Sequence, residues 1–229
     1  MSFDDRFSGI IKPEYRNEKI AVIGLGGIGS HTALGLFTTG YHHLILCDHD
    51  TVETANLGTQ VYHEQHLMQL KTLAMFSMMD SKAEHEDEED AVSTWDERYH
   101  FESMEESVPY SESRIVIAAV DSMEVRKQIL LDMIGYNMDG IFIDTRMASD
   151  EYQMQAFHCR NERAVERWHW NWFPDSAAVQ EPCTTRATYH TGLYAAARVL
   201  ATVNECMKIN AGTPGKLKEY ERYIIESTN

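Results

Sequence analysis

Short runs of apolar residues recur along the chain and predict the strands of a sheet. Four runs are almost wholly apolar, which is typical of strands buried on both faces of a parallel sheet. A fifth run alternates apolar and polar residues and predicts a further, antiparallel strand. The predicted strands span residues 19–23, 44–47, 114–120, 141–143 and, for the alternating run, 151–158.

Apolar residues spaced three or four positions apart predict helices between these strands. The predicted helices cover residues 31–39, 63–79, 123–134 and 188–209. The side chains of the second helix that we expect to face the core are Leu67, Leu70, Leu73 and Phe76. Those of the last helix are Leu193, Ala197, Leu200, Val203 and Met207.

Residues 160–182 predict a polar loop that carries an aromatic cluster at residues 168–173. We interpret the cluster as a packing plug for a crossover loop. The functional alternative is a lid, or a groove for an extended peptide tail.

Strands that alternate with helices predict an α/β fold of the Rossmann-like class. Its sheet is expected to be mostly parallel, with helices on both faces. A chain of 229 residues is long enough for one well-buried core and short for two domains. We therefore expect a single domain over residues 1–229, with a crossover loop at about 160–187.

The formal charge of -16 argues against nucleic acid or an anionic membrane as the main partner. Much of this charge lies in residues 84–90, which we interpret as a solvated surface, with a docking surface for a basic partner as the alternative. No apolar run approaches the roughly 18 residues of a membrane span. Widely spaced cysteines without a CxxC pair predict reduced thiols, and so a cytoplasmic protein.

A glycine-rich turn follows the first predicted strand and opens the first predicted helix. Its glycines are Gly24, Gly26, Gly27 and Gly29. Such glycines allow a tight turn and close approach of the backbone to phosphate, and the helix N-terminus presents free N–H groups. Asp48 ends the second strand, where a carboxylate can accept hydrogen bonds from ribose hydroxyls. The turn therefore predicts nucleotide binding.

Residues 46–60 extend the pattern beyond a simple dinucleotide site. They resemble the ThiF/MoeB/HesA family, bacterial relatives of ubiquitin-activating E1 enzymes. That family combines Gly-x-Gly-Gly-x-Gly with Asp-x-Asp-x-Val and Asn-Leu-x-Arg-Gln. The similarity continues at Lys71 and at residues 120–126, which look like the family's Asp-Asn-x-x-x-Arg. Residues 6–8 are similar to its Arg-Tyr-x-Arg-Gln opening, so the resemblance runs from about Arg6 to the last helix.

The resemblance implies a role for each matched residue. The glycine loop, Asp48 and Asp50 would hold ATP and its ribose. Asn56, Gln60 and Lys71 would bind the phosphates, with Lys71 offsetting charge on the transferring group. Asp121 would carry Mg²⁺.

Two positions depart from the family's pattern. Thr59 stands where the family has the arginine of Asn-Leu-x-Arg-Gln, and Gly9 stands where it has the second arginine of the opening motif. Both arginines supply positive charge to the triphosphate. Arg6, Lys12 or Arg16 are the candidates to replace them.

Cys183 lies in a segment similar to the Pro-x-Cys-Thr that carries the thioester cysteine of ubiquitin-type E1 enzymes. With Arg186 nearby and a helix following, it is a candidate thiolate nucleophile. The alternative is a small, half-buried residue at a helix start. Cys159 is a weaker candidate, and Cys47 and Cys206 are expected in the core.

The implied function is ATP-dependent adenylation of a C-terminal carboxylate. The expected partner is a small ubiquitin-like or sulfur-carrier protein, or a peptide, with possible transfer to Cys183. The family also implies a homodimer. One alternative is a nucleotide-binding scaffold that has lost adenylation, favoured by Thr59 and Gly9. Another is an NAD-dependent oxidoreductase, which leaves Lys71 and Asp121 unexplained.

Overall fold

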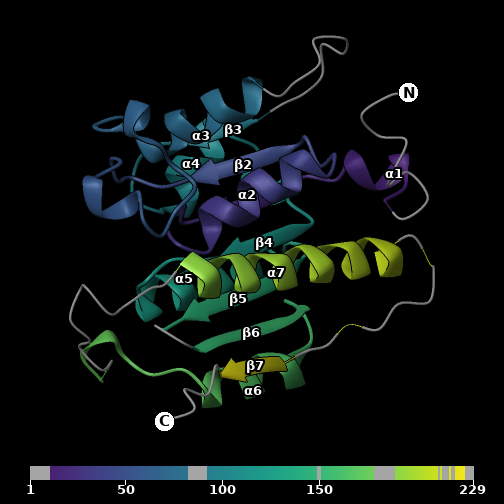
Figure 1. Ribbon diagram of the computed structural model, residues 1–229. Coiled ribbons are helices and arrows are strands. Elements are labelled where there is room, and N and C mark those ends of the chain that lie inside the picture. The colour runs from purple at the N-terminus through teal and green to yellow at the C-terminus, as the bar shows by residue number, and fades with distance from the viewer. Residues whose placement is uncertain are drawn as a thin grey trace.

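A seven-stranded sheet forms the centre of the molecule in the computed structural model (Figure 1). The structure describes residues 11–81, 92–148, 151–177, 189–210, 212, 217 and 220–224. The strand order is β3-β2-β1-β4-β5-β6-β7, and the first five strands of this order run parallel. The strands are β1 (Ile20–Ile23), β2 (Leu44–Cys47), β3 (Ser93–Trp95), β4 (Ile115–Ala118), β5 (Ile141–Met147), β6 (Glu151–His158) and β7 (Tyr220–Ile224).

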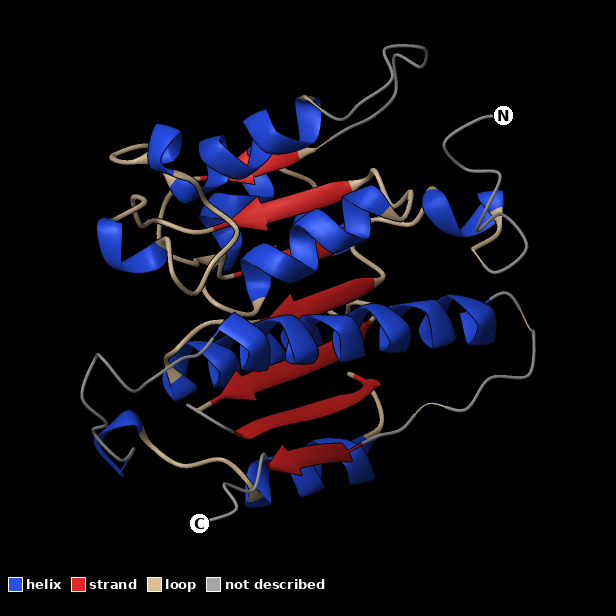
Figure 2. Cartoon of the chain, viewed as in Figure 1, coloured by secondary structure: helices blue, strands red, loops and turns tan. Residues whose placement is uncertain are grey.

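Helices cover both faces of this sheet, as the alternating pattern predicts. The first layer contains α2 (Gly29–Thr38), α3 (Lys71–Asp80) and α7 (Tyr189–Asn210). The second contains α4 (Phe101–Ser107), α5 (Met123–Gly135) and α6 (Glu162–Trp170). A short α1 (Pro13–Arg16) precedes β1, and single-turn 3₁₀ helices form at Thr54–Asn56, Glu64–His66, Tyr110–Glu112 and Asp175–Ala177. The α/β class with a mostly parallel sheet is confirmed (Figure 2).

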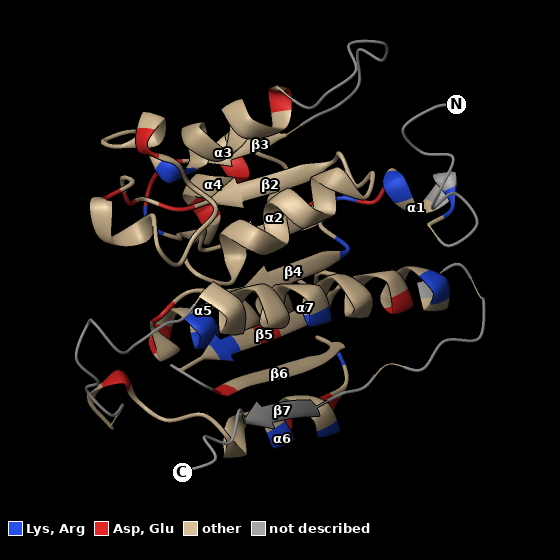
Figure 3. Cartoon of the chain, in the orientation of Figure 1, with Lys and Arg blue, Asp and Glu red and all other residues tan. Residues whose placement is uncertain are grey.

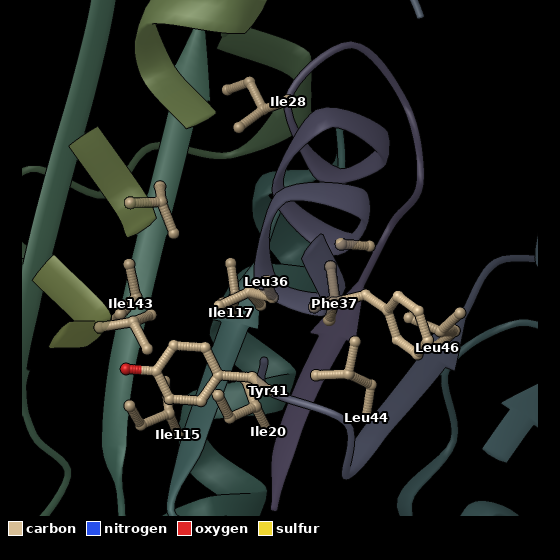
Figure 4. Close-up of a cluster of buried hydrophobic side chains, with 14 of the residues drawn as sticks. Ile20, Ile28, Leu36, Phe37, Tyr41, Leu44, Leu46, Ile115, Ile117 and Ile143 are labelled. Carbon is tan, nitrogen blue, oxygen red and sulfur yellow. The ribbon is translucent and has the colours of Figure 1, made fainter. Parts of the chain in front are cut away.

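The core between α2 and the sheet shows why the strands read as unbroken apolar runs. Leu36 and Phe37 of α2 pack onto β1, β2 and β4 (Figure 4). All four residues of β1, β2 and β4 are buried because helices cover both faces. β6 pairs antiparallel with β5, as its alternating pattern predicts.

The prediction of one helix over residues 63–79 is wrong in its first half. Helix α3 begins only at Lys71. Before it, Met68 adopts a φ of 66° and Leu70 bridges to Thr51, which holds the chain out of helical geometry. The expected core residues Leu73 and Phe76 are 48% and 43% exposed. The helix buries the opposite set, which includes Ala74, Met75 and Met79.

The final helix has nearly the predicted bounds but a rotated face. Leu193 is 49% exposed, and Ala197 is exposed as well. The residues buried against the sheet include Ala195, Ala196, Val199, Val203 and Met207. The lack of a side chain at Gly35 lets α2 and α7 approach closely within this layer, because a Cβ there would lie 2.6 Å from Leu200 of α7. α2 and α7 therefore lie side by side in Figure 1.

The predicted polar loop at residues 160–182 contains a helix. Asn161 caps α6 by accepting a hydrogen bond from the Ala164 N–H at 3.2 Å. Trp168 is fully buried, as the packing interpretation of the aromatic cluster requires, whereas Trp170 is 75% exposed. The sequence patterns also missed β3, α4 and β7. Within the described residues, no helix is long and apolar enough to cross a membrane.

Candidate functional site

The candidate site lies where the strand order reverses direction. From β1 the chain builds outward to β2 and β3 on one side, and β4 continues on the other side. The parallel strands point to the same edge of the sheet (Figure 2). The chain passes from β1 to α2 on one face of the sheet and from β4 to α5 on the other face, and open α/β sheets bind ligands at the carboxyl ends of their strands at such a switch point.

The glycine loop after β1 is closely packed on one side and open on the other. Gly24 has a φ of +92°, and a Cβ there would lie 2.7 Å from the Ala119 carbonyl oxygen. A Cβ on Gly29 would lie 1.8 Å from the Gly24 oxygen. A Cβ on Gly26, by contrast, would meet no atom of the described residues within 4 Å. The loop is thus a cradle with free space above Gly26, as phosphate binding at the start of α2 requires.

Two carboxylates and one lysine gather beside this loop. Asp48 Oδ2 accepts a hydrogen bond from the Leu25 N–H at 2.6 Å, which links the second strand to the glycine loop. Lys71 Nζ donates to Asp50 Oδ2 at 2.9 Å and lies 3.9 Å from Asp48 Oδ2. Burial acts to raise the pKa of Asp50, but Lys71 outweighs it and the pKa is lowered. The structure therefore brings together three residues that the sequence assigned to one site.

His49 joins the two carboxylates in a group whose potential ligand atoms lie within 4.8 Å of one another. The ammonium of Lys71 contacts both carboxylates of this group. Lys71 offsets one of their two negative charges, and both oxygens of Asp48 already accept backbone N–H hydrogen bonds, so the geometry favours a hydrogen-bonding role over a metal site.

Asn56 and Gln60 occupy the turn between Asp50 and Lys71. Asn56 Oδ1 accepts a hydrogen bond from the Glu53 N–H at 2.8 Å, so this side chain shapes the turn. Gln60 Oε1 is buried and has no hydrogen-bond partner among the described residues. A buried polar atom without a partner is costly. Gln60 thus leaves hydrogen-bonding capacity that a ligand can use.

Tyr62 is a buried support that the sequence analysis missed. Its hydroxyl donates to the Leu25 carbonyl oxygen at 3.1 Å and lies 3.5 Å from the Lys71 carbonyl oxygen. The glycine loop and the start of α3 are therefore joined through one phenol. No hydrophobic periodicity in the sequence indicates that Tyr62 is buried at the site. Only its position two residues after Gln60 points to the site.

Asp121 emerges just beyond β4, and its side chain is exposed. It makes no hydrogen bond with other residues in the described part of the chain. Next to it, Ser122 caps α5, and Asp175 accepts hydrogen bonds from Ser122 Oγ at 2.7 Å and from the Met123 N–H at 2.5 Å. Asp121 is thus exposed, with buried Arg126 as a nearby positive charge, while Asp175 occupies the helix N-terminus.

A buried ionic cluster supports the edge behind Asp121. Arg126 Nη1 donates to Asp144 Oδ1 at 2.5 Å and to the carbonyl oxygens of Ala118 and Thr145 at 2.9 and 2.8 Å. Arg146 and the indole N–H of Trp168 donate to the other oxygen of Asp144. Burial acts to raise the pKa of Asp144, but the two arginines outweigh it and hold the pKa below its ordinary value.

The start of α7 lies against the glycine loop. Tyr189 packs edge-on against His31 of α2, with ring centroids 4.9 Å apart. A Cβ on Gly192 would lie 2.5 Å from the Gly27 oxygen. Burial lowers the pKa of His31, opposed by its contact with the Thr59 carbonyl oxygen. The segment that precedes α7, including Cys183, lies outside the described residues, as do Arg6 and Gly9.

The candidate replacement cations that the structure describes lie away from this loop. Arg16 Nε lies 3.1 Å from the position of a Cβ on Gly40, just past the far end of α2. Lys12 lies over the ring of Tyr15, 5.9 Å from its centroid. Neither residue reaches the glycine loop of its own chain, because α2 separates the two ends by its length, about 15 Å.

The described cysteines are unsuited to nucleophilic chemistry. Burial raises the pKa of the Cys47 and Cys159 thiols, and that of Cys206 to about 12. A buried thiol that resists ionisation is a poor nucleophile. Burial therefore argues against Cys159, the weaker of the two candidate nucleophiles.

A cavity of about 460 Å³ lies elsewhere, at the end of α5 remote from Asp121. Its lining is Phe101, Glu102, Glu105, Glu106, Ser111 and Tyr136. Tyr136 lies just beyond the C-terminus of α5, whereas Asp121 precedes its N-terminus. The cavity is separate from the candidate site.

Comparison with known proteins shows which family has a similar sequence. The model of the ThiF family matches residues 12–225. Ubiquitin-like modifier-activating enzyme 5 of Dictyostelium discoideum is 32% identical over 120 residues, which cover 50% of this chain and 32% of that protein. Adenylyltransferase and sulfurtransferase MOCS3 of Drosophila persimilis is 39% identical over 51 residues, covering 22% of this chain and 11% of that protein. The chain thus spans about a third or less of these relatives.

Solved structures share the fold at lower sequence identity. A crystal structure of E. coli MccB with AMPCPP and MccA has a TM-score of 0.69 and 19% identity, covering 95% of this chain and 63% of that one. A structure of PaaA has a TM-score of 0.68 and 19% identity, covering 97% and 68%.

The Asp144 cluster gives a first testable prediction. Asp144→Asn leaves the buried guanidinium of Arg126 and the partly buried one of Arg146 without their shared counter-charge, so the free energy of unfolding should fall by about 3–5 kcal/mol. The matched control is Asp139→Asn. That carboxylate is 59% exposed where it pairs with Arg114, and its loss should cost about 1 kcal/mol or less. Urea denaturation of the three proteins measures both values.

The stability difference between the wild type and Asp144→Asn should depend on pH in a defined way. Because the folded-state pKa of Asp144 is lowered, its contribution is complete above the ordinary value of 3.8 and is lost as the pH falls through the folded-state pKa. The stability difference between wild type and Asp144→Asn should therefore narrow only below that ordinary value. A difference that fades near neutral pH would contradict the assignment.

Proposed function

Because the chain belongs to the ThiF family, we propose that it activates a C-terminal carboxylate by ATP-dependent adenylation. The acceptor is a small ubiquitin-like or sulfur-carrier protein, or a peptide. The observation that carries the proposal is the open space above Gly26, beside Asp48 and Lys71. A loop closed at Gly24 and Gly29 but open at Gly26 fits a phosphate chain better than a purely structural turn.

In the proposed reaction a carboxylate oxygen of the acceptor attacks the α-phosphorus of ATP. A new oxygen–phosphorus bond forms. The bond between the α-phosphorus and the oxygen that bridges the α- and β-phosphates breaks, and pyrophosphate leaves. Lys71 offsets charge on the phosphates, and Gln60 can donate from its amide N–H groups to phosphate oxygens. Asp121 would hold Mg²⁺, which would supply further positive charge to the phosphates. Asp48 and Asp50, just beyond β2, would accept hydrogen bonds from the ribose hydroxyls.

The second candidate function is a scaffold that binds nucleotide and has lost adenylation. Thr59 favours it, because this residue meets the glycine loop with its backbone oxygen and not with a cation. Pyrophosphate exchange separates the two functions. Radiolabelled pyrophosphate should enter ATP when candidate carrier proteins are present, and ATP binding without any exchange would favour the scaffold.

Partial coverage of the relatives bears on the proposal as well. The chain spans 32% of one relative and 11% of the other, so sulfur transfer and further steps of those proteins are not carried over. We propose the adenylation step alone, together with a covalent step at Cys183 treated below.

Gly26 offers a direct test of phosphate binding. Gly26→Ala adds a methyl group where the structure has open space, so the fold should be unaffected. The same methyl group should exclude the phosphates and weaken ATP binding by tenfold or more, roughly the loss of one or two charge-assisted hydrogen bonds. Calorimetry with Mg-ATP and a thermal melt measure the two effects.

Two further glycines serve as controls for this variant. Gly135→Ala also enters open space, at the end of α5, and should leave both ATP affinity and melting temperature close to wild type. Gly29→Ala should lower the melting temperature, because its Cβ meets the Gly24 oxygen. ATP binding by Gly26→Ala at wild-type strength, or tighter binding of NAD than of ATP, would remove the proposed site.

A homodimer is also proposed, supported by an uncharged helical surface. The first half of α7, before Arg198, contains no Lys, Arg, Asp or Glu and exposes Tyr189, Leu193 and Tyr194 (Figure 3). Two copies of a chain with a charge of -16 repel each other elsewhere, so an uncharged face is the favourable contact. We expect light scattering at micromolar concentration to give twice the protomer mass, and Leu193→Glu to give a single protomer. A monomeric wild-type protein would contradict the proposal.

Cys183 is proposed as the acceptor of the adenylated carboxylate. Cys183→Ala should abolish a reductant-sensitive conjugate with the carrier protein and leave pyrophosphate exchange intact, because adenylation precedes the covalent step. A structural cysteine would behave differently: its loss should lower the melting temperature and both activities together. Normal transfer by Cys183→Ala would leave an adenylating enzyme without a covalent step.

A further inference from the structure

Arg146 lies at the carboxyl end of β5, and none of the proposed steps uses it. Its side chain is 14% exposed, so part of the guanidinium reaches solvent. Nε and Nη2 donate to one oxygen of Asp144, at 2.9 and 2.5 Å. Nη1 donates to the Asn171 carbonyl oxygen at 3.1 Å. These three bonds fix the plane and position of the guanidinium.

The guanidinium keeps unused donors in this position. It has five N–H groups, and the three bonds leave one on Nη1 and one on Nη2. Neither has an acceptor within the part of the chain that the structure describes. A carboxylate accepts hydrogen bonds from two nitrogens of one guanidinium in this way. Arg146 is thus prepared for an anionic group that comes from outside.

The charge balance around Asp144 supports an anionic ligand. A single carboxylate forms ion pairs with both Arg126 and Arg146, so these ion pairs carry one positive charge in excess, which Asp121 offsets in part on the Arg126 side. Arg126 is 4% exposed and directs its donors to Asp144 and to backbone oxygens. The excess charge is therefore accessible at Arg146, in a chain whose overall charge is -16.

The face of the sheet on which Arg146 lies indicates which anion it binds. Side chains alternate along β5, so Arg146 and Asp144 share one face while Met147 lies on the other. Met147 lies on the glycine-loop side, where its methyl carbon is 2.8 Å from the position of a Cβ on Gly27. The proposed triphosphate site is therefore across the strand from Arg146. An anion at Arg146 belongs to a different substrate.

The segment beside Arg146 offers apolar surface for the rest of that substrate. Asn171, which accepts its hydrogen bond, lies between Trp170 and Trp172 in the sequence. Trp170 is 75% exposed and Phe173 is 40% exposed. Trp172 is fixed, since its indole N–H donates to the Met123 carbonyl oxygen at 2.9 Å. Exposed aromatic side chains on a fixed backbone are suited to holding an extended peptide.

We propose that Arg146 captures the terminal carboxylate of the acceptor as its tail enters, before this carboxylate moves past the end of β5 to the α-phosphorus of ATP, and that Trp170 and Phe173 contact the residues before it. This inference rests on the proposed adenylation and names the group that recognises its second substrate. Asp144 acts as a positioning residue, because it orients Arg146 and balances part of its charge. The assignment also gives a use to the exposed part of the aromatic cluster.

Protection from chemical modification tests the contact directly. The full chain is incubated with Mg²⁺ and a non-hydrolysable ATP analogue, then treated with phenylglyoxal, and modification of each arginine is measured by mass spectrometry. A mixed pool of short peptides with free C-terminal carboxylates should protect Arg146 several-fold. The same pool with amidated C-termini should give no protection. Arg114, whose side chain is 47% exposed where it pairs with Asp139, is the internal control and should react equally throughout.

Each other result overturns the assignment. Equal protection by both pools, or by neither, shows that Arg146 does not read a carboxylate. Protection by the ATP analogue alone assigns Arg146 to the triphosphate.

A variant separates recognition of the acceptor from support of the fold. Arg146→Lys keeps a positive charge beside Asp144 but loses the planar pair of donors. The KM for the peptide pool in pyrophosphate exchange should rise by at least about tenfold, while ATP affinity changes less than about twofold. Arg114→Lys should change neither value. A changed ATP affinity, or an unchanged KM, contradicts the role of Arg146.

Failure of the inference can be told apart from failure of the proposed function. Normal pyrophosphate exchange by both the wild type and Arg146→Lys would support adenylation and contradict the role of Arg146 in binding the acceptor. Absence of exchange in the wild type removes adenylation under these conditions, while the protection experiment still decides whether Arg146 binds a carboxylate.

Discussion

One buried guanidinium holds the carboxyl ends of two neighbouring strands together. Arg126 donates to Ala118 and Val120 at the end of β4 and to Thr145 on β5. The backbone hydrogen bonds between β4 and β5 end at this point, so the carbonyl groups beyond them need other partners. Buried carbonyl groups without partners would destabilise the fold. Asp121 follows Val120 directly, so the side chain that closes the sheet edge also fixes where this carboxylate emerges. The site depends on an interaction that does not itself touch the proposed substrates.

Local order in the sequence explains which parts of the site could be predicted. The glycine loop, Asp48 and the strands that carry them follow one another within a βαβ unit, whose geometry is largely fixed by its short connections. Lys71 was assigned through the family's order of motifs, and it does meet Asp50. The partner of Arg126 could not be inferred in this way. Asp144 reaches it only because β4 pairs with β5 in one particular register.

Helix faces were predicted less well than helix positions, for a physical reason. Leucines spaced three or four apart fit a helix whichever way it is turned, so spacing alone does not say which side meets the sheet. In α7 the side chains that face the sheet include alanines, which allow close packing, and Leu193 is left outside. In α3 the buried set includes Lys71, whose charge is balanced by carboxylates at the strand ends. Tertiary contacts, not hydrophobicity, decided both orientations.

Charge compensation limits how this site can handle a triphosphate. Lys71 is the cation that the structure places beside the glycine loop, and it already pairs with Asp50. Asp50 is 54% exposed on its side chain, so its carboxylate can remain hydrated if Lys71 turns toward phosphate. Such an exchange trades one ion pair for another and yields less than a cation held free for the ligand. If the site binds a triphosphate as proposed, Thr59 adds no side-chain charge to it. We therefore expect nucleotide affinity to be weak in the absence of Mg²⁺, because one ion-paired lysine offsets little of the charge of a triphosphate.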